Sequence, residues 1–319
     1  MKILWICDAW RKINQPSEST LRLIEESCLL GHENWFCDAD SIFIERKKLF
    51  LVVSPLHFNG LSISKQTREV LLSLEPFDKV FFRCDPPFTT SYNIKLKLLI
   101  HGNMLVDRND FIINSPEILL KFNSKISIDA FVGDISPLSL ISSNRAMLEN
   151  FCTTTGKVVA KTLTGGDGVG IELITWNEVS EKQKAKQLLS LMTHDYTKHI
   201  QLQEYLDIFT HGEIRIWFVK GEVICVAKKQ LKGSSFKFSM EKGDRLSKHE
   251  LTEAEIKTAA AISSFLQKQQ IHIAAVDMID SLVIDFNISS PGLLKEMENT
   301  LSENIAAKIL NSLLHPLTN

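Results

Sequence analysis

The sequence lacks several features that would assign the protein to a familiar class. Its six cysteines form no Cys-x-x-Cys pair, and none has zinc-like spacing with a histidine. No apolar stretch approaches the roughly 20 residues needed to span a bilayer. The formal net charge of −2 gives no electrostatic reason to expect nucleic acid or an anionic membrane as the main partner. These absences predict a cytoplasmic protein with reduced thiols that binds neither nucleic acid nor membrane.

Several catalytic signatures are also missing. There is no recognisable Ser-His or Cys-His arrangement, which fits a reaction without a covalent enzyme intermediate. The glycine-rich segment near residue 165 has no Gly-Lys-Ser/Thr ending, so it is not a Walker loop. It leads into a predicted strand and not a helix, which excludes a dinucleotide-binding fingerprint. No internal repeat or low-complexity tract is present.

The size and patterning of the chain favour an α/β protein. With 319 residues, 44% of them hydrophobic, the chain suits two or three packed units. Strand-like and helix-like segments alternate in the first third, which favours a parallel sheet with helices on its faces. We expect strands at residues 3–7, 34–37, 79–83, 157–161, 169–174, 200–205, 213–219, 222–228, 273–279 and 281–288, with another at 105–107 or 111–114. We expect helices at residues 20–30, 96–101, 178–192, 252–268 and 296–314.

Three local signals add detail to this pattern. Lys220-Gly221 predicts a hairpin turn between two strands. Thr252-x-x-Glu255 is a capping-box pattern at a helix start. Residues 231–244 are rich in Lys, Ser, Gly and Phe, and predict a mobile surface loop.

The glycine-rich segment is the strongest functional signal. Lys161 precedes four glycines that lie within six residues, Gly165, Gly166, Gly168 and Gly170. Such a backbone can turn tightly and direct its N–H groups at phosphate oxygens. The pattern indicates a phosphate-binding flap between two strands, with a lysine at its base. An ordinary glycine-rich hairpin is the alternative.

Three oxygen-bearing side chains near the C-terminus suggest a metal site. Asp285 and Asn287 are two residues apart on a predicted strand, so they face the same way. Asp277, on the preceding strand, supplies a third oxygen. Oxygen ligands on rigid strands suit Mg²⁺ and its bridging to ATP phosphates. Solvated acids at strand ends are the alternative.

A third segment could bind a nucleoside. Gln203, Glu204, Tyr205 and Leu206 end a predicted strand and could supply backbone groups to an adenine. Glu213 and Arg215 follow on the next strand, where a carboxylate could meet a ribose and a guanidinium fork could hold phosphate oxygens. A surface salt bridge is the alternative for this pair.

Together these motifs resemble the ATP-grasp superfamily and, within it, the prokaryotic glutathione synthetases. The resemblance spans nearly the whole chain. It includes Phe82–Phe88, close to the family's Arg-Lys-Asp-Pro-Pro-Phe-Asp, an ungapped run from Gln203 to Glu222, and Asn287-Ile-Ser-Ser-Pro291. It implies an ATP-grasp fold with an N-terminal parallel α/β (pre-ATP-grasp) domain at 1–120. A small lid subdomain at 121–199 and a C-terminal catalytic subdomain at 200–319 would follow.

The resemblance also implies a role for each candidate residue. Lys161 and Arg215 would be catalytic, Arg215 by steadying an acyl phosphate. ATP would be bound by Lys125, Lys161, Gly165, Gly166, Gly168, Gly170, Gln203, Glu204, Tyr205, Leu206 and Glu213. Metal ions would be bound by Asp277, Asp285 and Asn287, and substrate by Arg83, Ser290 and Gly292.

The implied activity is that of an ATP- and Mg²⁺- (or Mn²⁺-) dependent ligase. It would join a small-molecule or short-peptide carboxylate to an amine through an acyl phosphate, with γ-glutamylcysteine plus glycine as the family reaction. The resemblance also implies a frequent assembly into homo-oligomers. A related ligase for another amino acid or peptide is the alternative, followed by a non-catalytic ATP-binding protein.

This chain departs from the family pattern at three places. Asp285 stands where the family usually has Glu, and Thr89 replaces the last Asp of the Asp-Pro-Pro-Phe-Asp motif. The largest change lies in residues 231–244, where the family carries Arg-x-Asn-Leu and this chain has Phe236-Lys-Phe-Ser-Met240. In the family this loop covers the substrate, so the change bears on specificity more than on ATP use.

Overall fold

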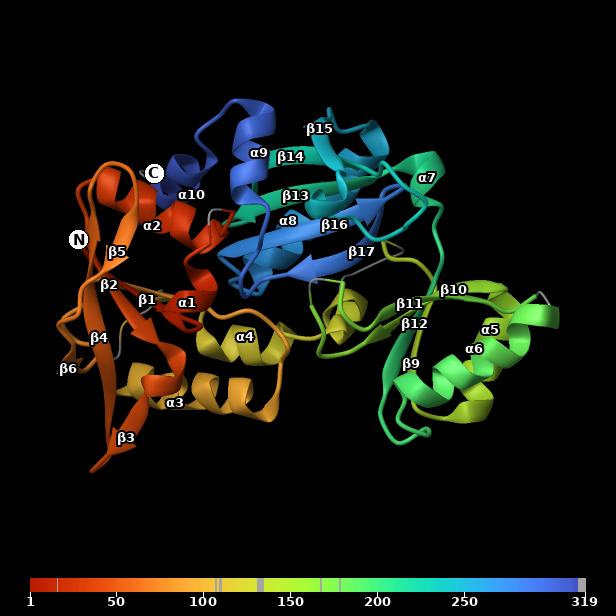
Figure 1. Ribbon diagram of the computed structural model, residues 1–319, viewed down its shortest axis with the longest axis horizontal. Coiled ribbons are helices and arrows are strands. Elements are labelled where there is room, and N and C mark those ends of the chain that lie inside the picture. Colours follow the sequence, from red (N-terminus) through yellow and green to blue (C-terminus); the bar gives the residue numbers. More distant parts are fainter. Residues whose placement is uncertain are drawn as a thin grey trace.

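The computed structural model describes residues 1–15, 17–106, 108, 111–130, 135–166, 168–177 and 179–314 (Figure 1). In these residues the strands form three sheets with eight, four and five strands. The first sheet and its helices form one end of the molecule, and the four-stranded sheet with α5 and α6 forms the other. The result confirms the predicted α/β class.

The N-terminal sheet is parallel at its centre and antiparallel at one side. The apolar strand β1 (Lys2–Cys7) pairs in parallel with β2 and β7, and β8 extends the parallel part. The antiparallel strands, which the alternation pattern did not predict, are added through β4. The other strands are β2 (Glu33–Asp38), β3 (Phe43–Glu45), β4 (Lys48–Phe58), β5 (Ile63–Lys65), β6 (Val70–Leu72), β7 (Lys79–Arg83) and β8 (Ile112–Ile113). The helices of this part are α1 (Trp10–Ile13), α2 (Ser19–Leu29), α3 (Thr90–Val106) and α4 (Pro116–Phe122).

The four-stranded sheet is antiparallel throughout, in the order β11-β10-β12-β9. Alternation along β10 directs Val158 and Ala160 into an apolar core with α5 and α6. The neighbouring positions Val159 and Lys161 therefore face away from these helices. The elements are β9 (Ser139–Ser142), α5 (Arg145–Thr155), β10 (Lys157–Thr162), β11 (Ile171–Thr175), α6 (Val179–Met192) and β12 (Ile200–Glu204).

The five-stranded sheet is also antiparallel, in the order β15-β14-β13-β16-β17. Its apolar residues share the largest core with the N-terminal sheet. The elements are α7 (Ile208–His211), β13 (Glu213–Val219), β14 (Glu222–Gln230), β15 (Arg245–Lys248), α8 (Glu253–Lys268), β16 (Ile273–Ile279) and β17 (Leu282–Asn287). The last helices, α9 (Leu294–Leu301) and α10 (Ile305–Leu314), return to contact α2 (Figure 1).

Two local predictions are confirmed, one at the β13–β14 turn and one at the start of α8. Lys220 and Gly221 have φ values of 50° and 82°, which suit a tight hairpin turn between β13 and β14. The Thr252 side chain accepts from the Glu255 N–H, and the Glu255 side chain accepts from the Thr252 N–H, so the capping box at α8 is present.

The structure corrects two predicted elements. The single helix at 296–314 is two helices, because Ser302 adopts φ 58° and ends α9. Residues 105 and 106 belong to α3 and not to a strand, while the alternative at 111–114 contains β8; residue 107 lies outside the described residues. Residue 178 also lies outside them. Strand β12 pairs with β10 and β9 and so belongs to the four-stranded sheet, while the predicted division of the chain at 199/200 stays a prediction.

No helix within the described ranges is long and apolar enough to cross a membrane.

Candidate functional site

A cavity of about 400 Å³ lies between the four-stranded and five-stranded sheets, beside the turn that follows β7. Strands β10 and β12 contribute residues from one side, and β13, β14, β16 and β17 from the other. Every predicted site residue lines this cavity except Gly170 and Arg83. Segments far apart in the sequence therefore meet at one place, as the motifs predicted.

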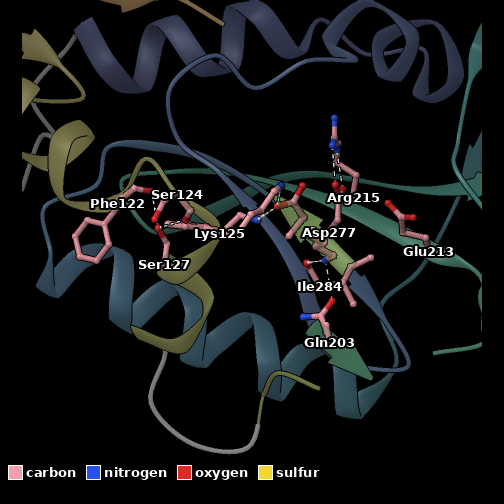
Figure 2. Close-up of polar contacts among 12 residues, drawn as sticks. Phe122, Ser124, Lys125, Ser127, Gln203, Glu213, Arg215, Asp277 and Ile284 are labelled. Carbon is pink, nitrogen blue, oxygen red and sulfur yellow. Dashed lines mark hydrogen bonds and ion pairs between the residues drawn. The ribbon is translucent and has the colours of Figure 1, made fainter. Parts of the chain in front are cut away.

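Lys161 is buried at the base of the cavity. Its Nζ donates to Oε1 of Gln203 at 2.8 Å and to the carbonyl oxygen of Ile284 at 2.7 Å (Figure 2). Ile284 is the extra residue of a bulge in β17, because the register with β16 shifts beside it. Burial, together with the positive charge of Lys125, lowers the pKa of Lys161 to about 8, against the opposing effect of Asp285.

Lys125 approaches the same point from another element. It begins a short 3-10 helix, Lys125–Ala130, and its Nζ lies 2.5 Å from Oδ1 of Asp285. Its backbone N–H donates to the Leu163 carbonyl at the start of the glycine-rich segment. Desolvation would raise the pKa of Asp285, but the charges of Lys125 and Lys161 outweigh it, and the pKa lies below its ordinary value.

A second charged cluster lies on the five-stranded sheet. Arg215 faces Asp277 across the β13–β16 ladder and donates from Nε and Nη2 to its two oxygens, at 2.8 and 2.7 Å. Lys229 lies 3.1 Å from Oδ1 of Asp277 and also pairs with Glu213, its cross-strand neighbour. Burial alone would raise the pKa of Asp277, yet Arg215 and Lys229 hold that pKa well below its usual range. The cluster therefore presents cations whose carboxylate partner stays ionised.

Lys229 was not among the residues predicted from the sequence. Along β14, Cys225 and Ala227 are buried, and Lys229 is the next residue on that same face, 6% exposed. Lysine is almost never fully buried unless it is paired. The sequence did contain a signal, a lysine in line with the buried face of a strand. The predicted strand ended at residue 228, however, whereas β14 extends to Gln230, so Lys229 lay outside the prediction.

The oxygen donors predicted to bind metal do converge. Asp277 and Asp285 are direct cross-strand partners, and Asn287 lies two residues further on the same face of β17. Asp285 uses Oδ1 for Lys125 and for the Phe286 N–H, which leaves a carboxylate with further acceptor capacity. Both oxygens of Asp277 accept from Arg215. Hard oxygen donors of this kind fit Mg²⁺, with Asp285 and Asn287 as the more available pair.

The glycine-rich segment, residues 163–170, lies against the N-terminal part of the chain. The Phe88 N–H donates to the Thr164 carbonyl at 2.9 Å. A Cβ on Gly166 would lie 1.9 Å from Cγ of Pro86, so only glycine fits this approach. Gly170 has φ +71° beside Thr162, and Asp167 lies outside the described residues. The segment is thus positioned over the cavity by the turn that follows β7.

The predicted adenine segment runs along the end of β12. The Glu204 N–H donates to the Leu138 carbonyl and the Tyr205 N–H to the Lys157 carbonyl, at 2.8 and 3.2 Å. Leu206 lines the cavity together with Val159 and other apolar residues. The arrangement places apolar side chains beside the end of a strand, which suits a planar base.

Arg83 is not among the residues that line the cavity, and its contact with substrate stays a prediction. The side chain is 2% exposed, and it donates to Oγ1 of Thr20 at 3.2 Å and to the Pro291 carbonyl at 3.0 Å. Burial lowers the pKa of this guanidinium. Arg83 thereby fixes the segment whose residues Ser290 and Gly292 do line the cavity.

The 231–244 loop closes the remaining side. It contains a short 3-10 helix, Met240–Lys242, and Phe236, Lys237 and Phe238 line the cavity. The sequence predicted this loop as a mobile surface segment, and the family resemblance implied that it covers the substrate.

Two family models match this chain in succession. The model of the prokaryotic glutathione synthetase N-terminal domain matches residues 1–119, and that of the ATP-grasp domain matches residues 124–302. The chain belongs to the prokaryotic glutathione synthetase family. The glutathione synthetase of Synechococcus elongatus is 24% identical over 324 residues, covering 98% of each chain. That of Vibrio parahaemolyticus is 22% identical over 323 residues, again covering 98% of each.

Solved structures confirm the ATP-grasp fold. The D-cycloserine synthetase DcsG has a TM-score of 0.67 at 13% identity and covers 98% of this chain and 100% of its own. The ATP-grasp ligase PsnB, complexed with a minimal precursor, has a TM-score of 0.62 at 15% identity and covers 98% of both chains. This member of the family is an ATP-grasp ligase, an enzyme class that uses ATP and Mg²⁺ to make amide bonds.

Proposed function

We propose that this ATP-grasp ligase joins a carboxylate to an amine through an acyl phosphate, with ATP and Mg²⁺. One observation supports the proposal most strongly: Lys125 and Lys161, from separate elements, both line the cavity beside β17, where Lys125 pairs with Asp285 and Lys161 donates to the carbonyl of the preceding residue, Ile284. Two lysines beside a strand pair rich in oxygen donors form a site for a polyphosphate and its metal.

The residues divide the work by position. Lys125 and Lys161 would exchange their present partners for phosphate oxygens, beneath the glycine-rich segment. Asp285 and Asn287, with Asp277 beside them, would hold Mg²⁺, which neutralises phosphate charge when it is bound. Arg215 and Lys229 would meet the oxygens of the reacting carboxylate, because Asp277 holds both cations at the cavity wall. Glu213 would lie towards the ribose.

The chemistry follows from the poor reactivity of a carboxylate. Its oxygen attacks the γ-phosphorus of ATP, and the bond to the β-phosphate oxygen breaks, which gives ADP and an acyl phosphate. The amine then attacks the carbonyl carbon, inorganic phosphate leaves, and the amine nitrogen loses a proton. The protein contributes positioning and charge neutralisation. The glycine-rich segment and the 231–244 loop would keep water from the intermediate.

The family reaction, γ-glutamylcysteine plus glycine, is the reference for the substrates. A different amino acid or peptide is the second candidate, favoured by Phe236 and Phe238 in the wall of the cavity. A non-catalytic ATP-binding protein is the third candidate. The presence of the charged cluster argues against it.

A phosphate-release assay tests the proposal. The purified chain would receive ATP, Mg²⁺ and a panel of carboxylate–amine pairs that includes γ-glutamylcysteine with glycine, with products identified by mass. We expect phosphate release together with an amide product for at least one pair. ATP binding without phosphate release across the panel would support the binding-protein reading.

A further inference from the structure

We infer that Phe236 and Phe238 select the carboxylate substrate, so that the residue carrying the reacting carboxylate has an aliphatic or aromatic side chain. The inference rests on the proposed ligase function and narrows its substrate class. It depends on the fixed position of the loop, its distance from the charged cluster and the chemistry of its side chains.

The two rings are held in place. They belong to the loop between β14 and β15, and both line the cavity. The Asp244 carboxylate accepts from the Lys232 N–H at 2.8 Å and from the Ser239 N–H at 2.7 Å. These two contacts lie on either side of the Phe pair in the sequence. The loop is therefore tied at both ends, and a substrate would not have to order it first.

The Phe238 ring lies beside the cations proposed to meet the reacting carboxylate. The Phe238 ring centroid is 5.6 Å from Nζ of Lys229, and Lys229 contacts the carboxylate that also holds Arg215. The predicted adenine slot, in contrast, is formed by Tyr205 and Leu206 on the other sheet. An apolar wall thus adjoins the cations that would receive the reacting carboxylate.

The chemistry of the wall favours an apolar partner. A phenylalanine ring offers no hydrogen-bond donor or acceptor to replace the water that a polar side chain loses. The charged residue between the rings, Lys237, has its Nζ 3.4 Å from Oε1 of Glu172 on β11. In an apolar pocket, one methylene changes kcat/KM by about 10-fold or more.

Hydroxylamine allows a test that does not require the natural amine. It attacks an acyl phosphate, releases phosphate and leaves a stable hydroxamate. The full chain would be assayed with ATP, Mg²⁺, hydroxylamine and γ-glutamyl or α-linked dipeptides that end in leucine, phenylalanine, serine or aspartate. We expect kcat/KM to be at least about 10-fold higher for the apolar endings than for the polar ones.

Variants assign the preference to the rings. Phe238→Ser should bring the ratio of apolar to polar kcat/KM close to one, whereas Phe238→Leu should preserve it. Phe209→Ser is the matched control, because Phe209 is 52% exposed on α7 and does not line the cavity. Thermal unfolding midpoints and the KM for ATP would confirm that each variant is folded and binds ATP.

The outcomes separate this inference from the proposed function. Hydroxamate from polar endings alone, or equal rates for both sets, would overturn the apolar assignment and leave the ligase proposal standing. A raised KM for ATP in Phe238→Ser, with an unchanged substrate ratio, would place the ring against ATP and also overturn it. No hydroxamate from any ending would overturn both.

Discussion

Lys161 illustrates how one residue combines burial with a charge-dependent task. It is 4% exposed, and its hydrogen-bond partners are an amide oxygen and a backbone carbonyl. Neither partner carries a full charge, and Lys125 is close enough to disfavour a second cation. Polyphosphate would provide the compensating charge that the protein alone does not supply in full.

We predict that ATP binding weakens above pH 8. Because burial lowers the pKa of Lys161 to about 8, this lysine loses its proton as the pH rises through that value. Bound phosphate favours the charged form, so the KM for ATP should be flat below this pH and rise above it. Steady-state kinetics from pH 6 to 10 would test this. Lys161→Met should lower kcat/KM by about 100-fold or more and remove the inflection.

We predict that Asp277→Asn destabilises the fold by about 3 kcal/mol, because it leaves buried Arg215 without its carboxylate and Lys229 with Glu213 alone. Since the pKa of Asp277 lies below its ordinary value, this contribution is present at neutral pH and is lost as the pH falls through the folded-state pKa. Urea unfolding would measure it. Asp280→Asn is the control, because that side chain is 62% exposed. An unchanged midpoint for Asp277→Asn would contradict the prediction.

At the scale of elements, the glycine-rich segment and the turn after β7 form one unit. Their contact joins the end of an N-terminal strand to the connection between β10 and β11. The close approach of Gly166 to Pro86 sets the position of the segment over the cavity.

We predict that Gly166→Ala lowers kcat/KM for ATP by about 10-fold or more, since the added methyl group would push the segment off Pro86. The matched control is Gly233→Ala, where an added Cβ meets nothing within 4 Å. Steady-state kinetics with thermal unfolding would separate the effect on ATP from an effect on folding. Equal kinetics for the two variants would show that the contact is dispensable.

The elements also show what the sequence could predict. Strong apolar runs located β7, β13 and β16 to the residue. The break at Ser302 was missed because it carries neither glycine nor proline.

The candidate residues were found from their spacing and family resemblance, and the cavity does bring most of them together. The sequence could not reveal the burial of Arg83 or the pairing of Lys229, because both depend on contacts between distant segments. Their roles in catalysis, like the division into units and a homo-oligomer, stay predictions.

At the scale of the whole molecule, Asn114 connects the N-terminal part to the five-stranded sheet. Its Nδ2 donates to the carbonyls of Ile273 and Ile288, both at 2.8 Å. Its Oδ1 accepts from the N–H groups of His272 and Ile273, at 2.7 and 3.0 Å. One amide side chain thus pairs with both ends of the β16–β17 hairpin that carries the metal-binding candidates.

We predict that Asn114→Ala costs about 3 kcal/mol in the free energy of unfolding, because several buried backbone groups lose their partners. Asn150→Ala, at an exposed position on α5, should be close to neutral. Urea titration followed by circular dichroism would measure both. Similar midpoints for the two variants would contradict a linking role for Asn114.

The bulge at Ile284 has a consequence for how this enzyme can be studied and can diverge. Lys161 donates to the backbone carbonyl of Ile284, which every amino acid carries, so alanine scanning would not report this contact. A substitution of the side chain leaves the hydrogen-bond acceptor in place. Only a change to the backbone itself, such as an ester in place of the amide, would expose what that position contributes.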